Sequence, residues 1–420
     1  MKKKTASLPV FFMIIGLLLS ACSGLRPLDD EAPAGEYGPV YTAQEHQMKT
    51  FDALWKNIED SYIYFDTADV NWQALHKQYV DQIESGLSAD EFMALLKGLE
   101  AELPEGSFIY QSRAERVEAD TADASTYDGI GAFVGFQEKL VPHIVILDVI
   151  DGSPADAAGL KAHDSIFEID GNPVLLEEGL SVVNRIRGPA GSSVSLEVQS
   201  PGKPQRTVDV ERAKLTSTGK LQASNIADTD YAYLLFPPLG YTGLDQDVFT
   251  SLQTLSANRE LKGLVLDLRI ANSSRDWPLD TLFTLFHDGK IGELYNRNEQ
   301  QPLEVQGQDV VGSQTLPLVI LVGKNTNGFS EIFAASLQMY KRATIIGEAT
   351  PGEVETQSSF YLPDGSRIFI ESTSFRLSNG DEIGTNGVTP DIQIEASWDQ
   401  VLPNDDPVLD KAIEILGDTK

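Results

Sequence analysis

Ser330 and Glu331 form the pair of neighbouring side chains in this 420-residue sequence that most resembles part of a hydrolytic site, with Glu353 and Gln357 further along. Acyl transfer needs an oxygen or sulfur nucleophile, a base within hydrogen-bond reach and donors for the oxyanion. A Ser before a Glu at a helix start is more typical of an N-cap with an acid in the first turn. Glu353 could act as a base only if burial raised its pKa.

Other catalytic chemistries lack the residues they need. The sequence contains no HExxH motif and a single cysteine, so it predicts no metal site, and we expect no cofactor. The histidines are His46, His76, His143, His163 and His287. His163 stands alone in a predicted turn, where a histidine is most often solvated, and we assign it no role.

The segment that carries these residues has the pattern of an α/β layer. Apolar runs that read as buried strands alternate with helical stretches, which indicates crossover connections. The expected strands are "KGLVLDLRI" (262–270), "PLVILVGKN" (317–325) and "ATIIGE" (343–348), with helices near 246–257 and 330–340, inside a core of 214–400 and before a C-terminal helix in 401–420.

Residues 126–213 are rich in strand signals separated by turns. Within them, "GSPADAAGLKAHDSIFEIDGNPV" (152–174) predicts a short helix, a turn and a strand that ends in Asp-Gly. This order resembles the signature of a PDZ domain. It departs from that signature at His163, where the family usually has Gly.

Residues 47–125 predict an N-terminal helical region. Apolar side chains recur at helical intervals, and "SADEFMALLKGLEAEL" begins with a Ser and a Glu three residues on, as a capping box does. The recurring side chains are Phe51, Leu54, Trp55, Ile58 and Tyr62.

The N-terminus has the layout of an export signal in residues 1–21, with three lysines followed by the apolar run "VFFMIIGLLL". The next residues, "LSACSG", resemble a bacterial lipobox, which would make Cys22 the acylated first residue of the mature chain. Residues 22–46 mix Pro, Gly and acids as a linker does. We therefore expect a lipoprotein of the bacterial cell envelope, anchored on the extracytoplasmic side of a membrane.

The formal net charge of −31 excludes one class of partner. Without a basic stripe to neutralise phosphates, nucleic acid is not expected to bind. The same charge disfavours electrostatic adhesion to anionic lipid, so the acyl chain must supply the membrane anchor.

The order of helical region, PDZ segment and α/β core, with the motifs "LDLR", "SEIFAASLQMYKRATIIGEATPG" and "GVTPDI", resembles the C-terminal processing peptidases, or tail-specific serine proteases. The resemblance implies an α+β multidomain protein with a crotonase- or ClpP-like core. It also implies a Ser nucleophile, a Lys base and a supporting Gln. These three positions correspond here to Gly328, Glu353 and Gln357, so the nucleophile and the base are both absent.

The resemblance also implies a Gly-Gly step after "LDLR" that lets backbone N–H groups reach the substrate carbonyl. Ser273 and Ser274 stand there instead, and side chains crowd a place where backbone must approach closely. Some relatives use a His from an earlier motif in place of the Lys. The corresponding stretch here, residues 103–110, contains no His.

Three hypotheses remain open. The first is a pseudoprotease whose PDZ domain binds unfolded or C-terminal peptide segments of envelope proteins, with Gly129, Ile130, Gly131 and Phe133 in the carboxylate-binding loop. The second is an active serine endopeptidase with Ser330 as a displaced nucleophile. The third is a structural lipoprotein whose acidic core surface binds another folded protein.

Overall fold

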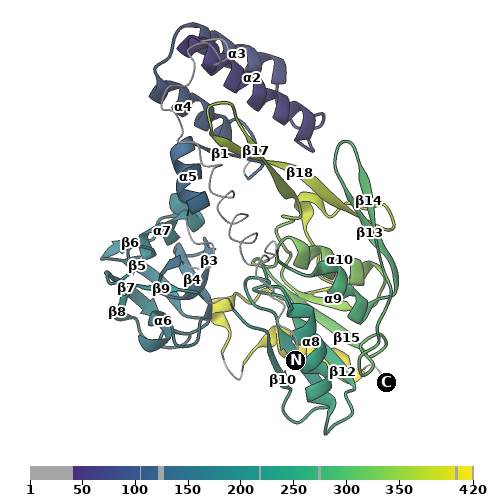
Figure 1. Ribbon diagram of the computed structural model, residues 1–420. Helices are drawn as coiled ribbons and strands as arrows, with labels where there is room; N and C mark the ends of the chain where they lie inside the picture. Colours follow the sequence, from purple (N-terminus) through teal and green to yellow (C-terminus); the bar gives the residue numbers. More distant parts are fainter. Residues whose placement is uncertain are drawn as a thin grey trace, which may run out of the picture.

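The computed structural model arranges the chain as three regions around a central gap between the ribbons (Figure 1). The described residues are 41–104, 106–121, 127–216, 219–272, 276–402 and 405–418. The predicted signal and acylated Cys22, most of the linker, and both Ser273 and Ser274 lie outside these ranges.

The N-terminal region packs its helices around buried aromatic and aliphatic side chains, as the helical spacing predicts. The first helix begins at Ala43, four residues before the predicted start, because Thr42 caps it in a capping box with Glu45. A second capping box joins Ser88 and Glu91, which confirms the predicted one. The elements are α2 (Ala43–Ser61), α3 (Trp72–Glu84), α4 (Ala89–Gly98), η1 (Leu99–Ala101), β1 (Phe108–Gln111) and α5 (Arg113–Thr121).

Strand β1 is an element of the predicted helical region that the helical spacing does not predict. It pairs antiparallel with β18 (Arg367–Leu377), so that Phe108 lies opposite Ile370. Ile368 and Ile370 of β18 also pack against Phe51 and other side chains of the helical region in one hydrophobic cluster. The N-terminal helices are therefore anchored on the far end of a sheet that belongs to the C-terminal half of the chain (Figure 1).

The predicted PDZ segment folds as a sheet in the order β3-β4-β5-β7-β8, with β2 and β9 paired beside it. The short helix expected at "ADAAGL" is α6, capped by Ser153. The elements are β2 (Tyr127–Gly129), β3 (Ala132–Gln137), β4 (His143–Val149), α6 (Pro154–Ala157), β5 (Ser165–Ile169), β6 (Asn172–Pro173), η2 (Leu176–Val182), α7 (Val183–Ile186), β7 (Ser193–Gln199), β8 (Arg206–Glu211) and β9 (Ala213–Leu215).

The core is built on a six-stranded sheet in the order β10-β11-β12-β15-β16-β19, parallel from β11 onward. The three predicted apolar runs form β12, β15 and β16, and the two predicted helices are α8 and α10. The elements are β10 (Gln222–Asn225), β11 (Tyr231–Leu235), α8 (Leu244–Ser256), β12 (Gly263–Asp267), β15 (Leu318–Val322), α10 (Phe329–Met339), β16 (Thr344–Gly347), β19 (Ile392–Gln393) and α11 (Pro407–Asp418).

Alternate residues of these strands bury two separate faces, because successive side chains in a strand point to opposite sides. Leu264, Leu266 and Ile320 join the cluster that includes α8, α9 (Leu279–Phe286) and α10. Val265, Val319 and Leu321 pack on the other face, against α11. Both faces are covered, which explains why the runs are apolar without alternation.

A second, antiparallel sheet extends from the core toward the N-terminal helices (Figure 1). Its long strand β18 carries β1 and β17 at one end and β13 at the other. The remaining elements of the core are β13 (Gly289–Tyr295), β14 (Gln300–Val305), β17 (Thr356–Tyr361), η3 (Gly384–Asn386) and η4 (Trp398–Gln400).

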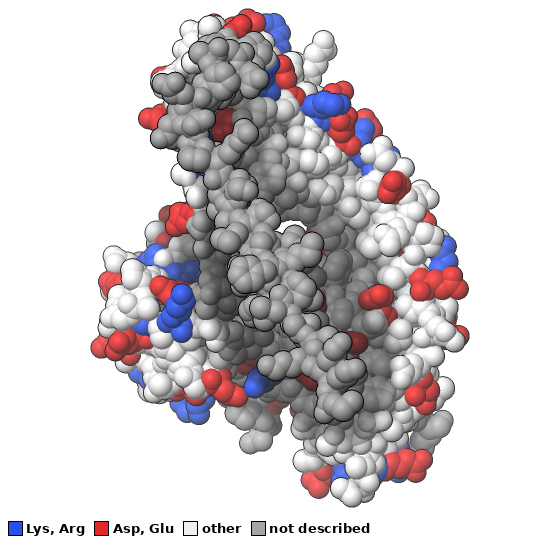
Figure 2. Space-filling view, in the orientation of Figure 1, with Lys and Arg blue, Asp and Glu red and all other residues white. Residues whose placement is uncertain are grey.

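Charged side chains are distributed over the outer surface. Figure 2 shows Asp and Glu spread over the visible parts of all three regions, with Lys and Arg among them. Within the described ranges, no helix combines the length and apolarity needed to cross a membrane.

Gly347 at the end of β16 provides a test of the sheet's packing. Its φ is 132°, and a Cβ there would lie 2.0 Å from the carbonyl oxygen of Val322 on the paired strand. We expect Gly347→Ala to lower the free energy of unfolding by about 3 kcal/mol or more, through overpacking added to backbone strain.

Gly86→Ala is the matched control for this change, since Gly86 also has a positive φ but no atom within 4 Å of its Cβ position. It should cost only about 1 kcal/mol of backbone strain. Urea denaturation of both variants compares the two effects, and equal losses of stability would contradict the proposed crowding at Gly347.

Candidate functional site

Helix α10 begins at the position that the resemblance assigns to the nucleophile. Gly328 is its N-cap, with φ 66° and ψ −129°, at the sharp turn that follows β15. L side chains rarely adopt this backbone conformation, and strained strand-to-helix turns are one way in which enzymes expose a nucleophile. The turn therefore has a backbone conformation of the kind that can expose a nucleophile, whereas the residue there has no side chain to react.

The interpretation of Ser330 as the N-cap is wrong, because the cap lies two residues earlier, at Gly328. Ser330 is a fully buried residue in the first turn. Its Oγ lies 2.6 Å from the carbonyl oxygen of Ala271 and 2.8 Å from that of Asn327. Both oxygens can only accept, so the hydroxyl proton is directed at backbone and the side chain ties the helix start to the segment after β12.

Glu331 is the central side chain of the site. It is 0 % exposed, and its carboxylate accepts hydrogen bonds from the N–H groups of Gly328, Gly352 and Glu353 and from the Thr350 hydroxyl. Burial raises the pKa of Glu331 above its ordinary value, although these four hydrogen bonds oppose that shift. The sequence marked this residue only as an acid in the first turn of a helix.

One carboxylate oxygen of Glu331 joins the two positions that the resemblance assigns to nucleophile and base. Its Oε2 lies 3.0 Å from the Gly328 nitrogen and 2.9 Å from the Glu353 nitrogen. The structure thus brings positions 328 and 353 together, as a nucleophile and a base would require. The exposed Glu353 carboxylate accepts a 3.0 Å hydrogen bond from Asn327.

Gln357, the third position of the set, is directed elsewhere. It is exposed on β17, and its amide donates a 2.7 Å hydrogen bond to the carbonyl oxygen of Gly106. This contact joins β17 to the loop before β1. Gln357 therefore contributes to the joint between the core and the N-terminal region.

A pocket of about 350 Å³ opens beside Glu353 and is lined by two further acids, Glu355 and Glu371. Burial, together with the charges of Glu355 and Glu353, raises the pKa of Glu371 to about 7. Tyr64 donates a hydrogen bond to Glu355. Sequence reasoning missed Glu355 and Glu371, because neither belongs to a motif.

A second pocket, of about 560 Å³, lies along β3 of the PDZ segment. All four predicted peptide-binding residues line it. The pocket is mostly apolar, and Leu239 of the core forms part of its wall. Among the described residues, the N–H groups of Ile130 and Gly131 have no hydrogen-bond acceptor. Ile130 is only 4 % exposed, and a buried N–H normally has a partner, so this end of the pocket fits an anion.

Gly131 is needed for this loop, whereas Gly129 is not. Gly131 has φ +82°, and a Cβ there would lie 2.3 Å from the Cβ of Ser153. Gly129 has no positive φ, pairs with Ala213 in a regular ladder, and has room for a Cβ beside Tyr127. The conformational freedom expected of both glycines is required at Gly131 alone.

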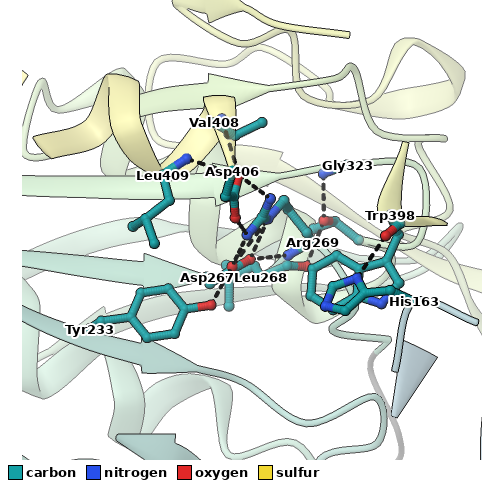
Figure 3. Close-up of polar contacts among 11 residues, drawn as sticks. His163, Tyr233, Asp267, Leu268, Arg269, Gly323, Trp398, Asp406, Val408 and Leu409 are labelled. Carbon is teal, nitrogen blue, oxygen red and sulfur yellow. Dashed lines mark hydrogen bonds and ion pairs between the residues drawn. The ribbon is translucent and has the colours of Figure 1, made fainter. Parts of the chain in front are cut away.

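Arg269 of the "LDLR" motif is buried rather than directed at the site. Its guanidinium contacts the carboxylates of Asp267 and Asp406, with shortest distances of 2.6 and 2.7 Å (Figure 3). The segment that follows approaches the helix start, since the Asn327 nitrogen donates to the carbonyl oxygen of Ala271. In the described part of the chain, no group of three or more His, Cys, Asp or Glu side chains could hold a metal ion.

Comparison with known proteins finds a matching family model for each of the three regions. Residues 230–394 match peptidase family S41, residues 145–200 a PDZ domain, and residues 43–99 the tricorn protease C1 domain. A carboxyl-terminal-processing protease of Picosynechococcus is 30% identical over 356 residues, which cover 80% of each chain. This chain belongs to the C-terminal processing peptidase family.

Further relatives match over most of their length. The chloroplastic C-terminal processing peptidase of Tetradesmus obliquus is 27% identical, over 90% of this chain and 82% of the relative. The solved photosystem II D1 C-terminal processing protease has the same fold, with a TM-score of 0.63 and 22% identity over 90% of this chain and 98% of that one. The resemblance stated from the motifs is thereby confirmed for the family and the fold.

Glu331→Gln tests the role of the buried carboxylate in this member of the family. An amide offers one acceptor oxygen where the carboxylate offers two, and its NH₂ would face donors. We expect the free energy of unfolding to fall by about 3 kcal/mol, as for a buried hydrogen-bonded charge that loses its partners. Chemical denaturation measures this.

Glu353→Gln in the same loop is the control, because Glu353 is exposed, and it should change stability by less than about 0.5 kcal/mol. If Glu331→Gln lowers the free energy of unfolding by as little as this control, the Glu331 carboxylate does not stabilise the site.

Proposed function

We propose that this protein is a catalytically inactive member of its family that binds the free C-termini of peptides in its PDZ pocket. The observation that carries the proposal is the pair of N–H groups at Ile130 and Gly131, which have no acceptor among the described residues and lie at the end of an apolar pocket. An extended peptide can add to the edge of a PDZ sheet while backbone donors hold its terminal carboxylate. The relatives' names, which state that they process carboxyl termini, support the same ligand class.

The site at α10 supports the absence of catalysis. Gly328 has no nucleophile, and Glu353 carries a negative charge where the family resemblance places a Lys. Glu353 lies exposed at a pocket that two further acids line. A carboxylate is a much weaker base than an amine, so an exposed glutamate is a poor replacement for a lysine as a general base.

Ser330 is a poor alternative nucleophile. Its hydroxyl is fully buried and hydrogen-bonded to backbone carbonyls, and no hydrogen bond joins it to a described base. On the face that Figure 2 shows, acids lie among Lys and Arg side chains, so this face gives little support to the third hypothesis. We propose in addition that Cys22 anchors the protein in the bacterial envelope, on the sequence pattern alone.

The first test of this function is peptide binding. A short peptide that ends in Val should bind at least about tenfold more tightly as the free acid than as the amide, because amidation removes the charge that the backbone donors hold. Gly131→Ala should abolish binding through its clash with Ser153, whereas Gly129→Ala should leave affinity within about twofold. Calorimetry measures all of these. Equal affinity for the free-acid and the amidated peptide would contradict the proposal that the pocket binds a terminal carboxylate.

A second test restores the missing chemistry. The unaltered chain, Gly328→Ser and Glu353→Lys should each fail to cleave an unfolded substrate, as read by mass spectrometry, because each lacks at least one member of the pair. The double variant should be faint at best, since the nearby Glu355 and Glu371 would keep the new lysine protonated. Adding Glu371→Gln should then raise activity. Robust cleavage by the unaltered chain, lost in Ser330→Ala, would overturn the proposal.

A further inference from the structure

The PDZ domain contacts the core through an apolar cluster that joins Val145 and Leu147 to Ile270 and Trp398, and through polar contacts with one short turn near the C-terminus of the chain. This turn, which we name the docking turn, comprises residues 397–400 and includes η4 (Figure 1). Three PDZ side chains contact it: His143 of β4, His163 of the turn before β5, and Ser165 of β5. Two of the five histidines of the sequence therefore lie at the polar part of the contact between the PDZ domain and the core.

His143 has an acceptor at each ring nitrogen. Nδ1 lies 2.8 Å from the carbonyl oxygen of Val141, and Nε2 lies 3.1 Å from a carboxylate oxygen of Asp399. Both nitrogens must carry a proton to satisfy both contacts, so the geometry fits the charged imidazolium. The ring is buried, stacks on Phe167, and forms an ion pair with Asp399 across the domain boundary.

His163 contacts the adjacent residue of the docking turn. Its ring lies 4.3 Å from the Trp398 ring, centroid to centroid, and Nδ1 lies 2.6 Å from the carbonyl oxygen of Trp398. The expectation of a solvated turn residue was wrong. His163 holds a φ of 75°, which costs about 1 kcal/mol relative to the glycine that this turn would accept without strain. The contacts with Trp398 offset that backbone strain.

Trp398 in turn rests on the most buried charge cluster of the core. The Arg269 guanidinium lies 5.0 Å from its ring centroid and is fixed by Asp267 and Asp406 (Figure 3). Tyr233 adds a hydrogen bond to Asp267. The docking turn is thus held at the C-terminal edge of the core sheet. The groups at this contact whose charge we expect to change with pH, His143 and His163, lie on the PDZ side.

We propose that His143 and His163 form a latch that docks the PDZ domain on the core near neutral pH and releases it at more acidic or more alkaline pH. The latch requires one histidine to be charged and the other to be neutral. Its release would remove Leu239 of the core from the wall of the PDZ pocket, so the shape of that pocket depends on docking. The latch itself does not depend on the proposed function.

The alkaline limit comes from His143. Burial lowers the pKa of His143, but its hydrogen bonds to Asp399 and to the Val141 carbonyl, with the charge of Asp399, raise it above the ordinary value overall. A histidine with a raised pKa stabilises the docked state fully below its ordinary pKa of about 6.5. That contribution is lost as the pH rises through the docked-state pKa.

The acidic limit comes from His163. Burial is the largest cause of its lowered pKa, and the charge of Arg269 adds to it. The Trp398 carbonyl, Asp406 and Asp267 oppose this shift without reversing it. A histidine with a lowered pKa stabilises the docked state fully above about pH 6.5 and loses that contribution as the pH falls through the docked-state pKa. Docking should therefore be strongest at about pH 6.5.

Fluorescence energy transfer between the two domains tests the latch directly. The full chain with Cys22→Ala contains no cysteine, so dyes can be placed at Lys203→Cys in the PDZ domain and Asn258→Cys in the core, both exposed. Single-molecule distributions from pH 5 to 9 should show one docked population near pH 6.5. The undocked fraction should rise about tenfold toward each end, as expected for loss of one hydrogen bond to a charged group.

Two latch variants and one control variant test which histidine sets the alkaline pH limit of docking and which sets the acidic limit. His143→Gln keeps a donor for Asp399 without a titrating charge, so the alkaline rise should disappear. His163→Gly relaxes the backbone and should fold readily, yet it should raise the undocked fraction about tenfold at pH 6.5 and remove the acidic rise. The control is His76→Gln, in the helical region beside Trp55, which should keep both rises. A distribution that is independent of pH in the unaltered chain, or unchanged by both latch variants, would overturn the proposal.

Discussion

The buried carboxylate of Glu331 is the interaction on which the site depends. It satisfies three backbone N–H groups and one hydroxyl from two segments that no sheet ladder joins, the start of α10 and the loop at 350–353. A fully buried carboxylate left without these donors would be strongly destabilising, so the two segments must stay together while Glu331 is present. This explains how the two segments keep positions 328 and 353 close together without a side-chain contact between those two positions.

The parts that the sequence predicted are those set by local patterns. Uninterrupted apolar runs identified β12, β15 and β16, because both faces of that sheet are covered, and the capping box at Ser88 marked the start of α4. The N-cap of α10 was placed two residues late, at Ser330, although a signal for Gly328 was present. Counting back three residues from Glu331, as a capping box requires, leads to Gly328. A glycine cap has no side chain and was overlooked.

The parts that the sequence could not predict depend on contacts between distant residues. Strand β1 has four residues and no alternation signal of its own, and only its pairing with β18 makes it a strand. Glu355 and Glu371 line a pocket because three loops and strand β18 converge there. The sequence predicted a solvated turn residue at His163, because its partner Trp398 lies 235 positions further along the chain. No pattern within a short window contains these pairs.

Gly328 and Glu353 affect the stability of the folded site in opposite directions. Glycine at 328 relieves the backbone strain that any other residue would hold at φ 66° and ψ −129°. Glutamate at 353 does the reverse, because its charge lies close enough to Glu371 to help raise the pKa of that buried acid to about 7. Position 328 therefore carries no conformational strain, whereas position 353 adds electrostatic repulsion, and the two positions affect the stability of the site independently of whether it has activity.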